Sequence, residues 1–171
     1  DSPVHHYILH ILYMIVPLLF LLSCGQDEAQ LQFEREAFGE PSGFTKTSGT
    51  GEIDRENVDE DDWRISPFFS GLVYSVDPIY PNPVLSNDRL TLQTSLAGIN
   101  DIQRIQVFSF SYQLQASMPV ADYPGPIPSI VILSLDAGTI PFHRENPLGL
   151  HRLIVTDERE NVITYGDVLI E

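Results

Sequence analysis

The residue types that most often carry out chemistry are sparse in this sequence of 171 residues. Cys24 is the only cysteine, and the histidines that follow it are His143 and His151, which stand eight residues apart with Pro147 and Gly149 between them. A zinc site would need a third ligand and usually a closer pair of histidines. The two imidazoles are therefore interpreted as loop or surface groups.

Catalytic motifs of the common kinds are missing from the sequence. There is no Gly-Lys-Ser/Thr phosphate loop, no His-Glu-x-x-His pair and no Gly-x-Ser-x-Gly turn. A nucleophile needs a base and an orienting group within reach, whereas the one thiol stands beside an apolar run. We therefore predict a protein that is not an enzyme and that carries no cofactor.

Carboxylates are concentrated in residues 52–62, where seven of the eleven side chains are acidic. Carboxylate oxygens are the ligands of Ca²⁺, which takes about six to eight of them, so Asp59, Asp61 and Asp62 are weak candidates for a metal site. The central glycine and the distal glutamate of an EF-hand loop are missing at the required offsets. The favoured interpretation is a solvated linker whose charges repel one another.

The whole sequence is strongly acidic, with a formal net charge of −15 from 24 acidic and nine basic residues. Such a surface repels a phosphate backbone, so we predict no nucleic-acid partner. It also repels anionic lipid headgroups. Association with a membrane would therefore need an anchor other than charge.

An apolar segment, residues 7–22, lies near the start of the sequence and is interrupted only by His10. It is shorter than the roughly 20 residues that a membrane-spanning helix needs, and Pro17 would kink such a helix. Its length suits the apolar region of a secretory signal peptide. Residues 1–6 contain no lysine, arginine or methionine, so we expect that a charged leader precedes them.

The apolar segment ends in Leu-Leu-Ser-Cys, residues 21–24, and the chain then turns acidic. This stretch resembles the lipobox of bacterial lipoproteins. The resemblance implies a signal peptide over residues 1–23, cleavage before Cys24 and diacylation of its sulfur. Several acyl chains hold a protein on a membrane durably, since each buried CH₂ contributes about 0.8 kcal/mol. The alternative is a cysteine that ends a core helix or a membrane span.

The residues after Cys24 bear on the membrane to which the protein is sorted. Gly25 takes the place of the aspartate that would retain a lipoprotein at the inner membrane, and acids follow in Gln26-Asp27-Glu28. This acidic stretch is similar to the export tag of surface lipoproteins in the Bacteroidota. The resemblance implies a protein lipid-anchored in the outer membrane, on its periplasmic or its cell-surface face.

Residues 24–62 are predicted to form a lipid-anchored, flexible, acidic tether. Residues 26–38 have the spacing of a short amphipathic helix, with Leu31, Phe33 and Phe38 on one stripe. The residues that follow this helix are rich in glycine, serine and threonine, as flexible linkers are.

Trp63, Phe68 and Phe69 mark an abrupt change to apolar residues after the tether. Large aromatic side chains mostly serve packing. The favoured interpretation is therefore a strap or first strand on the following domain, fixed by Trp63. The alternative is an aromatic patch that contacts an envelope protein partner or a carbohydrate ring.

Residues 63–171 are predicted to form a β-sandwich domain that begins with this strap. Short apolar runs alternate with turn residues, as in an all-β protein. Loops are expected at 121–128 and 136–149, and Gly166 is expected to split the last strand. About seven strands without helical periods indicate an antiparallel sandwich. The expected strands are residues 72–76, 88–96, 102–114, 129–135, 150–156, 162–165 and 167–170.

A family resemblance lies in the segment Gly-Leu-His-Arg-Leu-Ile-Val-Thr-Asp-Glu-Arg-Glu-Asn, residues 149–161. It is similar to the closing hairpin of immunoglobulin-like domains in bacterial surface proteins, a phrase of the type Gly-Leu-Tyr-x-Val-x-Val-x-Asp-x-x-Gly-Asn. The sequence departs from this phrase at His151 and Glu160. The resemblance implies an all-β, antiparallel immunoglobulin-like sandwich, preceded by a signal or anchor helix and an acidic linker.

These observations favour a lipid-anchored, non-enzymatic cell-envelope protein that binds a ligand or assembles with a partner through its sandwich. The alternative is a structural accessory subunit of a larger membrane or envelope complex, docked by the aromatic segment. A small enzyme acting on envelope polymers ranks last. A concave aromatic groove would favour ligand binding, and a pocket that gathers both histidines with carboxylates would revive the enzyme.

Overall fold

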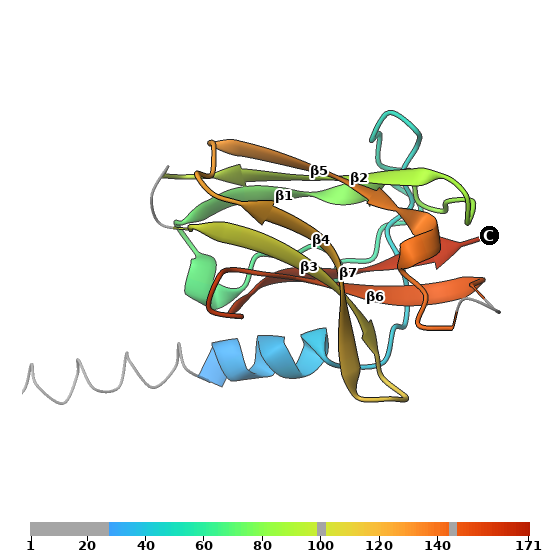
Figure 1. Ribbon diagram of the computed structural model, residues 1–171, viewed down its shortest axis with the longest axis horizontal. Coiled ribbons are helices and arrows are strands. Elements are labelled where there is room, and N and C mark those ends of the chain that lie inside the picture. The colour runs from blue at the N-terminus through green and yellow to red at the C-terminus, as the bar shows by residue number, and fades with distance from the viewer. Residues whose placement is uncertain (1–27, 99–101, 144–146) are drawn as a thin grey trace, which may run out of the picture.

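Seven strands form two antiparallel sheets in the computed structural model, which describes residues 28–98, 102–143 and 147–171 (Figure 1). One sheet has the strand order β1-β2-β5 and the other has the order β4-β3-β6-β7. Two short 3₁₀ helices, η1 and η2, precede β1 and follow β5. The bounds are η1 Pro67–Phe69, β1 Val73–Tyr80, β2 Arg89–Leu96, β3 Arg104–Ser111, β4 Ala116–Pro124, β5 Ile130–Asp136, η2 Ala137–Thr139, β6 Gly149–Thr156 and β7 Val162–Ile170.

The core lies between the two sheets and follows from alternation along the strands, which turns every second side chain to one face. In β2 every second residue is buried. Its pairing partner β5 has the same period. The prediction of a mostly β protein with antiparallel sheets is thus confirmed. The buried residues of these two strands are Leu90, Leu92, Thr94, Leu96, Val131, Leu133 and Leu135.

β3 is a central strand, paired with β4 on one side and with β6 on the other. Apolar side chains occur on both faces of the strand, as a strand covered on both sides requires. Ile105 and Val107 lie in the core between the sheets. Phe110 belongs to a second cluster with Ile154 and Val162, on the opposite face.

β4 is the strand that the sequence does not reveal. A loop is predicted over residues 121–128, whereas β4 pairs with β3 as far as Pro124. Pro119 and Pro124 hide the strand, because a proline has no N–H to offer a neighbour and is rare in sheets. β4 lies at the edge of its sheet, where a proline is tolerated.

β7 runs through Gly166 without the predicted split. The need for a glycine at position 166 has a different cause. The Trp63 indole packs against it so closely that a Cβ atom at this position would overlap the ring. Gly166 therefore makes room for Trp63 and does not bend the strand.

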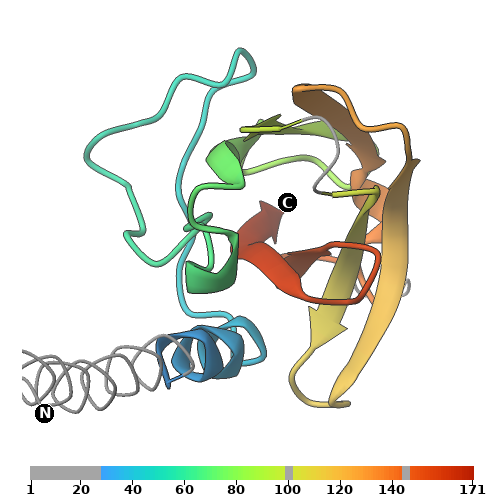
Figure 2. The ribbon, with the colours of Figure 1, turned by 90° about the vertical axis from the view of Figure 1, so that its left-hand side faces the viewer.

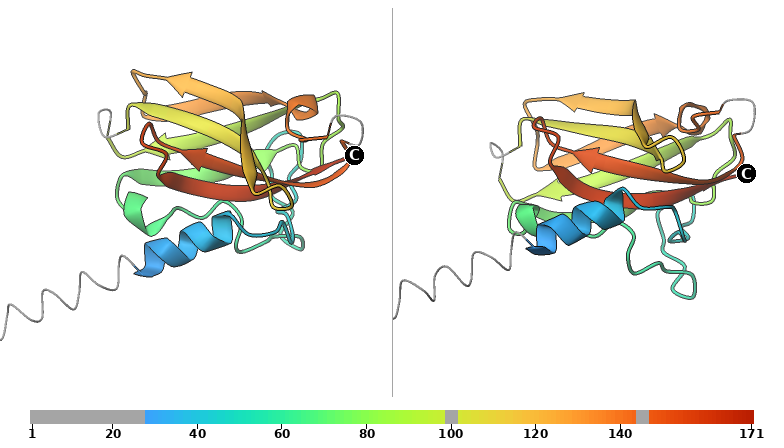
Figure 3. Two further views of the ribbon diagram at one scale, coloured as in Figure 1. Left: turned by 60° about the horizontal axis from the view of Figure 1, so that its bottom comes forward. Right: turned by 90° about the horizontal axis from the view of Figure 1, so that it is seen from below.

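A helix over residues 28–37 packs on the outer face of the four-stranded sheet (Figure 3). The sequence predicted a helix here, but its buried side chains are Phe33 and Ala37, whereas Leu31 is exposed. The side chains of the sheet that belong to the same buried cluster are Phe110, Ile154, Val162 and Tyr165. None of the helices in the described residues is long and apolar enough to cross a bilayer. The predicted signal peptide, residues 1–23, lies outside them.

Residues 40–62 form a long loop beside the sandwich (Figure 2). Thr45 and Thr47 are buried in it. The Thr47 N–H donates to the Asn82 carbonyl at 2.8 Å, and Asn82 Nδ2 donates to the Thr45 carbonyl at 3.1 Å. The helix and these bonds attach residues 28–62 to the domain, where the sequence predicts a flexible tether.

Candidate functional site

A pocket of about 210 Å³ lies at the end of the sandwich where β3 ends and β6 begins. Four segments that are far apart in the sequence line it. The topology brings them together, because the chain leaving the helix, the β3–β4 turn and the start of β6 meet at this end. The lining segments are residues 40–41, 110–113, 142–143 and 150–151.

The pocket gathers His143, His151 and Glu40, which the sequence analysis did not connect. His151 Nε2 lies 2.9 Å from the Pro147 carbonyl oxygen. A carbonyl only accepts, so Nε2 carries the proton and donates. Burial lowers the pKa of His151 although this hydrogen bond opposes the change. The ring is therefore neutral near pH 7, and its Nδ1 is a hydrogen-bond acceptor.

Aromatic rings supply the apolar part of the pocket. Phe110, Tyr112 and Phe142 are among its lining residues, together with polar groups such as Gln113. Pockets for drug-sized ligands measure about 300–1,000 Å³, so this one fits a smaller molecule. Phe110 is the buried aromatic residue near the end of β3, and Tyr112 follows it in the turn to β4.

The polar contacts of the pocket include one between side chains of its β3–β4 turn. Ser111 Oγ donates to Gln113 Oε1 at 3.4 Å, and no hydrogen bond joins it to either histidine within the described residues. A nucleophile would need a base within hydrogen-bond reach. In the same described ranges, no three His, Cys, Asp or Glu side chains gather closely enough to hold a metal ion.

The aromatic segment is divided between the core and the surface. Trp63 and Phe69 are only 4% and 1% exposed and lie in the core between the sheets, whereas Phe68 is 57% exposed. Trp63 and Phe69 therefore pack into their own domain and are not available to a partner. Phe68 alone of the three predicted contact residues is free for one. We refer to residues 63–66 as the strap.

The strap covers the edge of β7 that does not pair with β6. The Trp63 N–H donates to the Tyr165 carbonyl at 2.7 Å, and the Ser66 N–H donates to the Ile163 carbonyl at 2.9 Å. Residues 82–86 continue this cover to the end of the strand. An unpaired strand edge is a site for pairing with another chain, so these two segments protect β7.

The three aspartates that were weak metal candidates engage in separate interactions. Asp59 Oδ1 accepts the Asp61 N–H at 3.0 Å. The Asp61 carboxylate forms an exposed ion pair with Arg64 at 3.3 Å. Asp62 is directed inward and accepts two backbone N–H groups.

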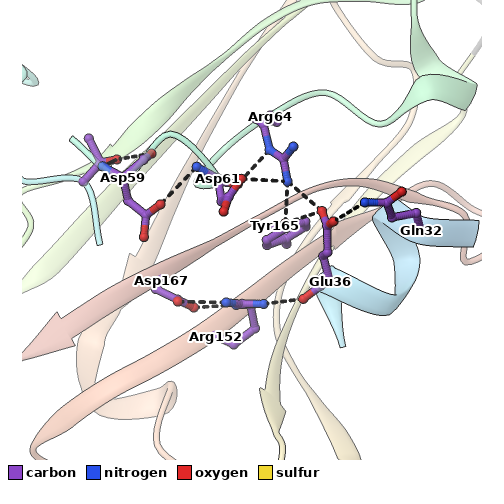
Figure 4. Close-up of polar contacts among 9 residues, drawn as sticks. Gln32, Glu36, Asp59, Asp61, Arg64, Arg152, Tyr165 and Asp167 are labelled. Carbon is purple, nitrogen blue, oxygen red and sulfur yellow. Dashed lines mark hydrogen bonds and ion pairs between the residues drawn. The ribbon is translucent and has the colours of Figure 1, made fainter. Parts of the chain in front are cut away.

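A buried ion pair joins Arg152 of β6 to Asp167 of β7 beneath the end of the helix (Figure 4). Arg152 Nη2 donates to Asp167 Oδ2 at 2.8 Å, and Nε donates to the other carboxylate oxygen. Nη1 donates to the Glu36 carbonyl at 2.7 Å, one of the last helical carbonyls, which have no partner inside a helix. The guanidinium also lies over the Tyr165 ring, 4.7 Å from its centre. Arg152 therefore fastens the helix to the sheet.

A second, more exposed set of contacts links the strap to the helix. Arg64 Nη2 donates to Glu36 Oε2 and to Tyr165 Oη, both at 2.8 Å (Figure 4). Exposed ion pairs contribute little to stability. The less exposed link between helix and sheet is the one from Arg152 to the Glu36 and Ala37 carbonyls.

Asp62 is expected to make the stability of the fold depend on pH. Burial, followed by the nearby carboxylates of Asp167 and Asp59, raises the pKa of Asp62 to about 7, although two backbone donors oppose the rise. The unfolded chain has the ordinary value of 3.8. The stabilising contribution of Asp62 is therefore full below about pH 4 and is lost as the pH rises toward 7.

The measurement compares wild type with Asp62→Asn by denaturant unfolding at about pH 4 and about pH 8. From about pH 4 to about pH 8, the free energy of unfolding of the wild type should fall by up to a few kcal/mol relative to that of Asp62→Asn. One pKa unit corresponds to about 1.4 kcal/mol. Asp61→Asn, which changes an exposed neighbour, is the control. A difference that stays constant with pH for Asp62→Asn would contradict the expectation.

Cys24, the predicted lipidation residue, lies outside the described residues, four positions before Glu28. The sequence analysis missed Arg152, Asp167 and Asn82 as organising residues. For Arg152 and Asp167, the available signal was a charged side chain inside a largely apolar strand. No protein-family model matches the sequence, and no curated protein matches it.

Proposed function

We propose that this chain is a lipid-anchored, non-enzymatic protein of the cell envelope that binds a small sugar-like ligand in the pocket beside His143 and His151. The observation that carries the proposal is the pocket, where aromatic rings and hydrogen-bonding groups from four segments meet. Its aromatic lining is the feature expected of ligand binding, and its two histidines with Glu40 are the arrangement expected of the enzyme, which is therefore the second candidate.

The chemistry of the pocket suits a neutral, polyhydroxylated ring. Tyr112 and Phe142 offer apolar surface for stacking, whereas Phe110 is only 6% exposed. Glu40 and the neutral His151 offer acceptors for hydroxyl groups. The volume of about 210 Å³ corresponds to one ring and not to a chain of several. The net charge of −15 disfavours an anionic ligand.

The strand order supports an immunoglobulin-like fold as part of this proposal. A constant-type immunoglobulin domain has its first, second, fifth and fourth strands in one sheet and its third, sixth and seventh in the other. Here the fourth strand, β4, lies beside β3, and the rest of the order is the same. Glu160 has a φ of 65°, at the position where the family phrase has a glycine, the residue that adopts this region most readily.

The support for the lipid anchor comes from residues 21–24 and from the acids that follow them. Only three residues separate Cys24 from the start of the described helix at Glu28. A location at the outer membrane, on its periplasmic or its cell-surface face, belongs to the same proposal.

One preparation tests both parts, namely the full chain extracted with detergent from membranes of a Gram-negative host. Its intact mass should lack residues 1–23 and include acyl chains on Cys24. N-acetylglucosamine should receive saturation transfer from the protein in NMR. The substitution Phe142→Ala should weaken its binding about tenfold, which corresponds to about 1.4 kcal/mol, because a stacking face is removed.

Tyr74→Ala is the matched control, since Tyr74 is an exposed aromatic residue of β1 outside the pocket. This variant should bind the sugar as the wild type does. A sugar that fails to bind the wild type, or that binds Phe142→Ala equally well, would refute the ligand. A bare thiol on an intact leader would refute the anchor.

The two other functions make different demands on the structure. An accessory subunit would dock through the aromatic segment, and the burial of Trp63 and Phe69 leaves it only Phe68. An enzyme acting on envelope polymers would use the histidines with Glu40. Release of product from such a polymer by the wild type, and not by a His151→Ala variant, would favour the enzyme.

A further inference from the structure

The packed helix fixes how far the sandwich stands from residue 24. Phe33 and Ala37 bury one side of the helix against the sheet. Arg152 Nη1 binds the Glu36 carbonyl at the helix end. The helix is therefore part of the folded body and not of a tether, and the body begins at Glu28 at the latest.

Covalent geometry then limits the distance from Cys24 to this body. Four peptide units join Cys24 to Glu28, and consecutive Cα atoms are about 3.8 Å apart. The two Cα atoms therefore lie within about 15 Å of each other, whatever path the chain takes. With acyl chains on Cys24, which is the premise taken from the proposed function, the first helical turn lies beside the lipid headgroups.

Two large apolar side chains are exposed next to that first turn. Leu31 belongs to the turn itself. The Phe68 N–H donates to Gln30 Oε1 at 3.0 Å, which places η1 beside the helix start (Figure 1). The Phe68 ring packs edge-on against the buried Phe69, with ring centres 5.1 Å apart. The contact with Phe69 thus holds the Phe68 ring in place while leaving it exposed to solvent.

We infer that the end of the molecule formed by the first helical turn and η1 faces the lipid surface, with Phe68 and Leu31 inserted among the headgroups. Phenylalanine and leucine favour the boundary between headgroups and acyl chains. Charge does not draw an acidic protein to an anionic membrane. The acyl chains provide proximity, and these two side chains select the orientation.

The same orientation directs the pocket away from the membrane. Glu40 and Pro41 at the pocket follow the last helical turn. A helix over residues 28–37 is about 15 Å long, at about 1.5 Å per residue. The start of β6, which also lines the pocket, lies at the far end of the sandwich from η1 (Figure 1). A ligand would therefore enter from the aqueous side.

The test uses the full chain, acylated on Cys24, in vesicles of phosphatidylethanolamine and phosphatidylglycerol. Cys24 is the only cysteine, so once its sulfur is acylated, a cysteine introduced by Phe68→Cys or Ile132→Cys is the only free thiol and takes a nitroxide label. Ile132 of β5 is 57% exposed, as Phe68 is. The two positions are therefore matched in exposure and differ in location.

The label at position 68 should be several-fold more accessible to oxygen, relative to a water-soluble nickel chelate, than the label at position 132. Equal accessibility, with acyl chains shown on Cys24 by intact mass, would overturn the orientation and leave the anchor standing. A bare Cys24 in the membrane-bound protein would overturn both. The melting temperature of each labelled protein shows that the fold is retained.

Discussion

The Arg152→Ala variant is expected to have a free energy of unfolding about 3–5 kcal/mol lower than the wild type. Asp167 is 1% exposed and would remain as a buried charge without its partner. The Glu36 and Ala37 carbonyls would also lose their hydrogen bonds from Arg152, and the Glu36 carbonyl would keep only the one from the Gly39 N–H. Chemical denaturation measures the loss, and amide hydrogen exchange in residues 28–37 should rise because the helix is released first.

Arg104→Ala is the matched control for this substitution. Arg104 also forms a two-point pair, with Asp122, but on the surface. Exposed pairs contribute little, so this variant should remain close to the wild type. The double variant Arg152→Met, Asp167→Leu should recover part of the loss, since apolar replacement of both partners is often neutral. An Arg152→Ala variant as stable as the control would contradict the role assigned to Arg152.

The Trp63→Ala variant is expected to lose about 3–5 kcal/mol, the usual cost of removing a large buried ring. The side chain is buried between the sheets, against Gly166. Conversely, Gly166→Ala should cost about 1–3 kcal/mol, because the new methyl group would overlap the indole. Both values can be obtained from denaturant unfolding.

The two substitutions are expected to be non-additive, as for residues in direct contact. In the Trp63→Ala background the space above Gly166 is open, and Gly166→Ala should then cost little. Phe68→Ala, which changes an exposed ring of the same segment, is the control and should be close to neutral. Strictly additive losses would show that Trp63 and Gly166 do not touch.

The parts of the fold that the sequence predicted are those with local signals. β2 follows from the period of two in its apolar residues. β5 follows from its density of Ile, Val and Leu, which indicated a buried strand, whereas Ile130 and Ile132 are exposed. The turn between β6 and β7 follows from Asp157, whose Oδ1 accepts the N–H groups of Arg159 and Asn161 at 2.9 and 2.8 Å. Each of these signals is contained in a few neighbouring residues, so it can be recognised from a short stretch of the sequence.

The path of residues 28–62 was not predictable in this way. Their composition is that of a linker, but their polar groups have partners far along the chain. Asp62 accepts the N–H of Asp167, which is 105 positions away, and Thr47 binds Asn82. The local sequence contains only one partner of each hydrogen bond and therefore indicates a solvated segment. The fold brings the other partner into contact from a distant part of the chain.

The candidate site could not be predicted for the same reason, because its residues are far apart in the sequence. His143 and His151 were identified, but nothing near them in the sequence indicated that Glu40 and Phe110 would line the same pocket. Their meeting depends on where the helix ends and on which strands neighbour β3. For Trp63, by contrast, the favoured packing role follows from residue type alone.

The cover on β7 has a consequence for association between copies of this protein. Sheets extend from one molecule to the next when an edge strand offers free backbone groups. Those of β7 are engaged by the strap and by residues 82–86 of the same chain. Proteolytic removal of residues up to 66 would free the Ile163 and Tyr165 carbonyls and the Asp167 N–H, while residues 82–86 would still cover the end of β7. A clipped molecule would thus become a template for fibrillar growth, whereas the intact one is protected along that side.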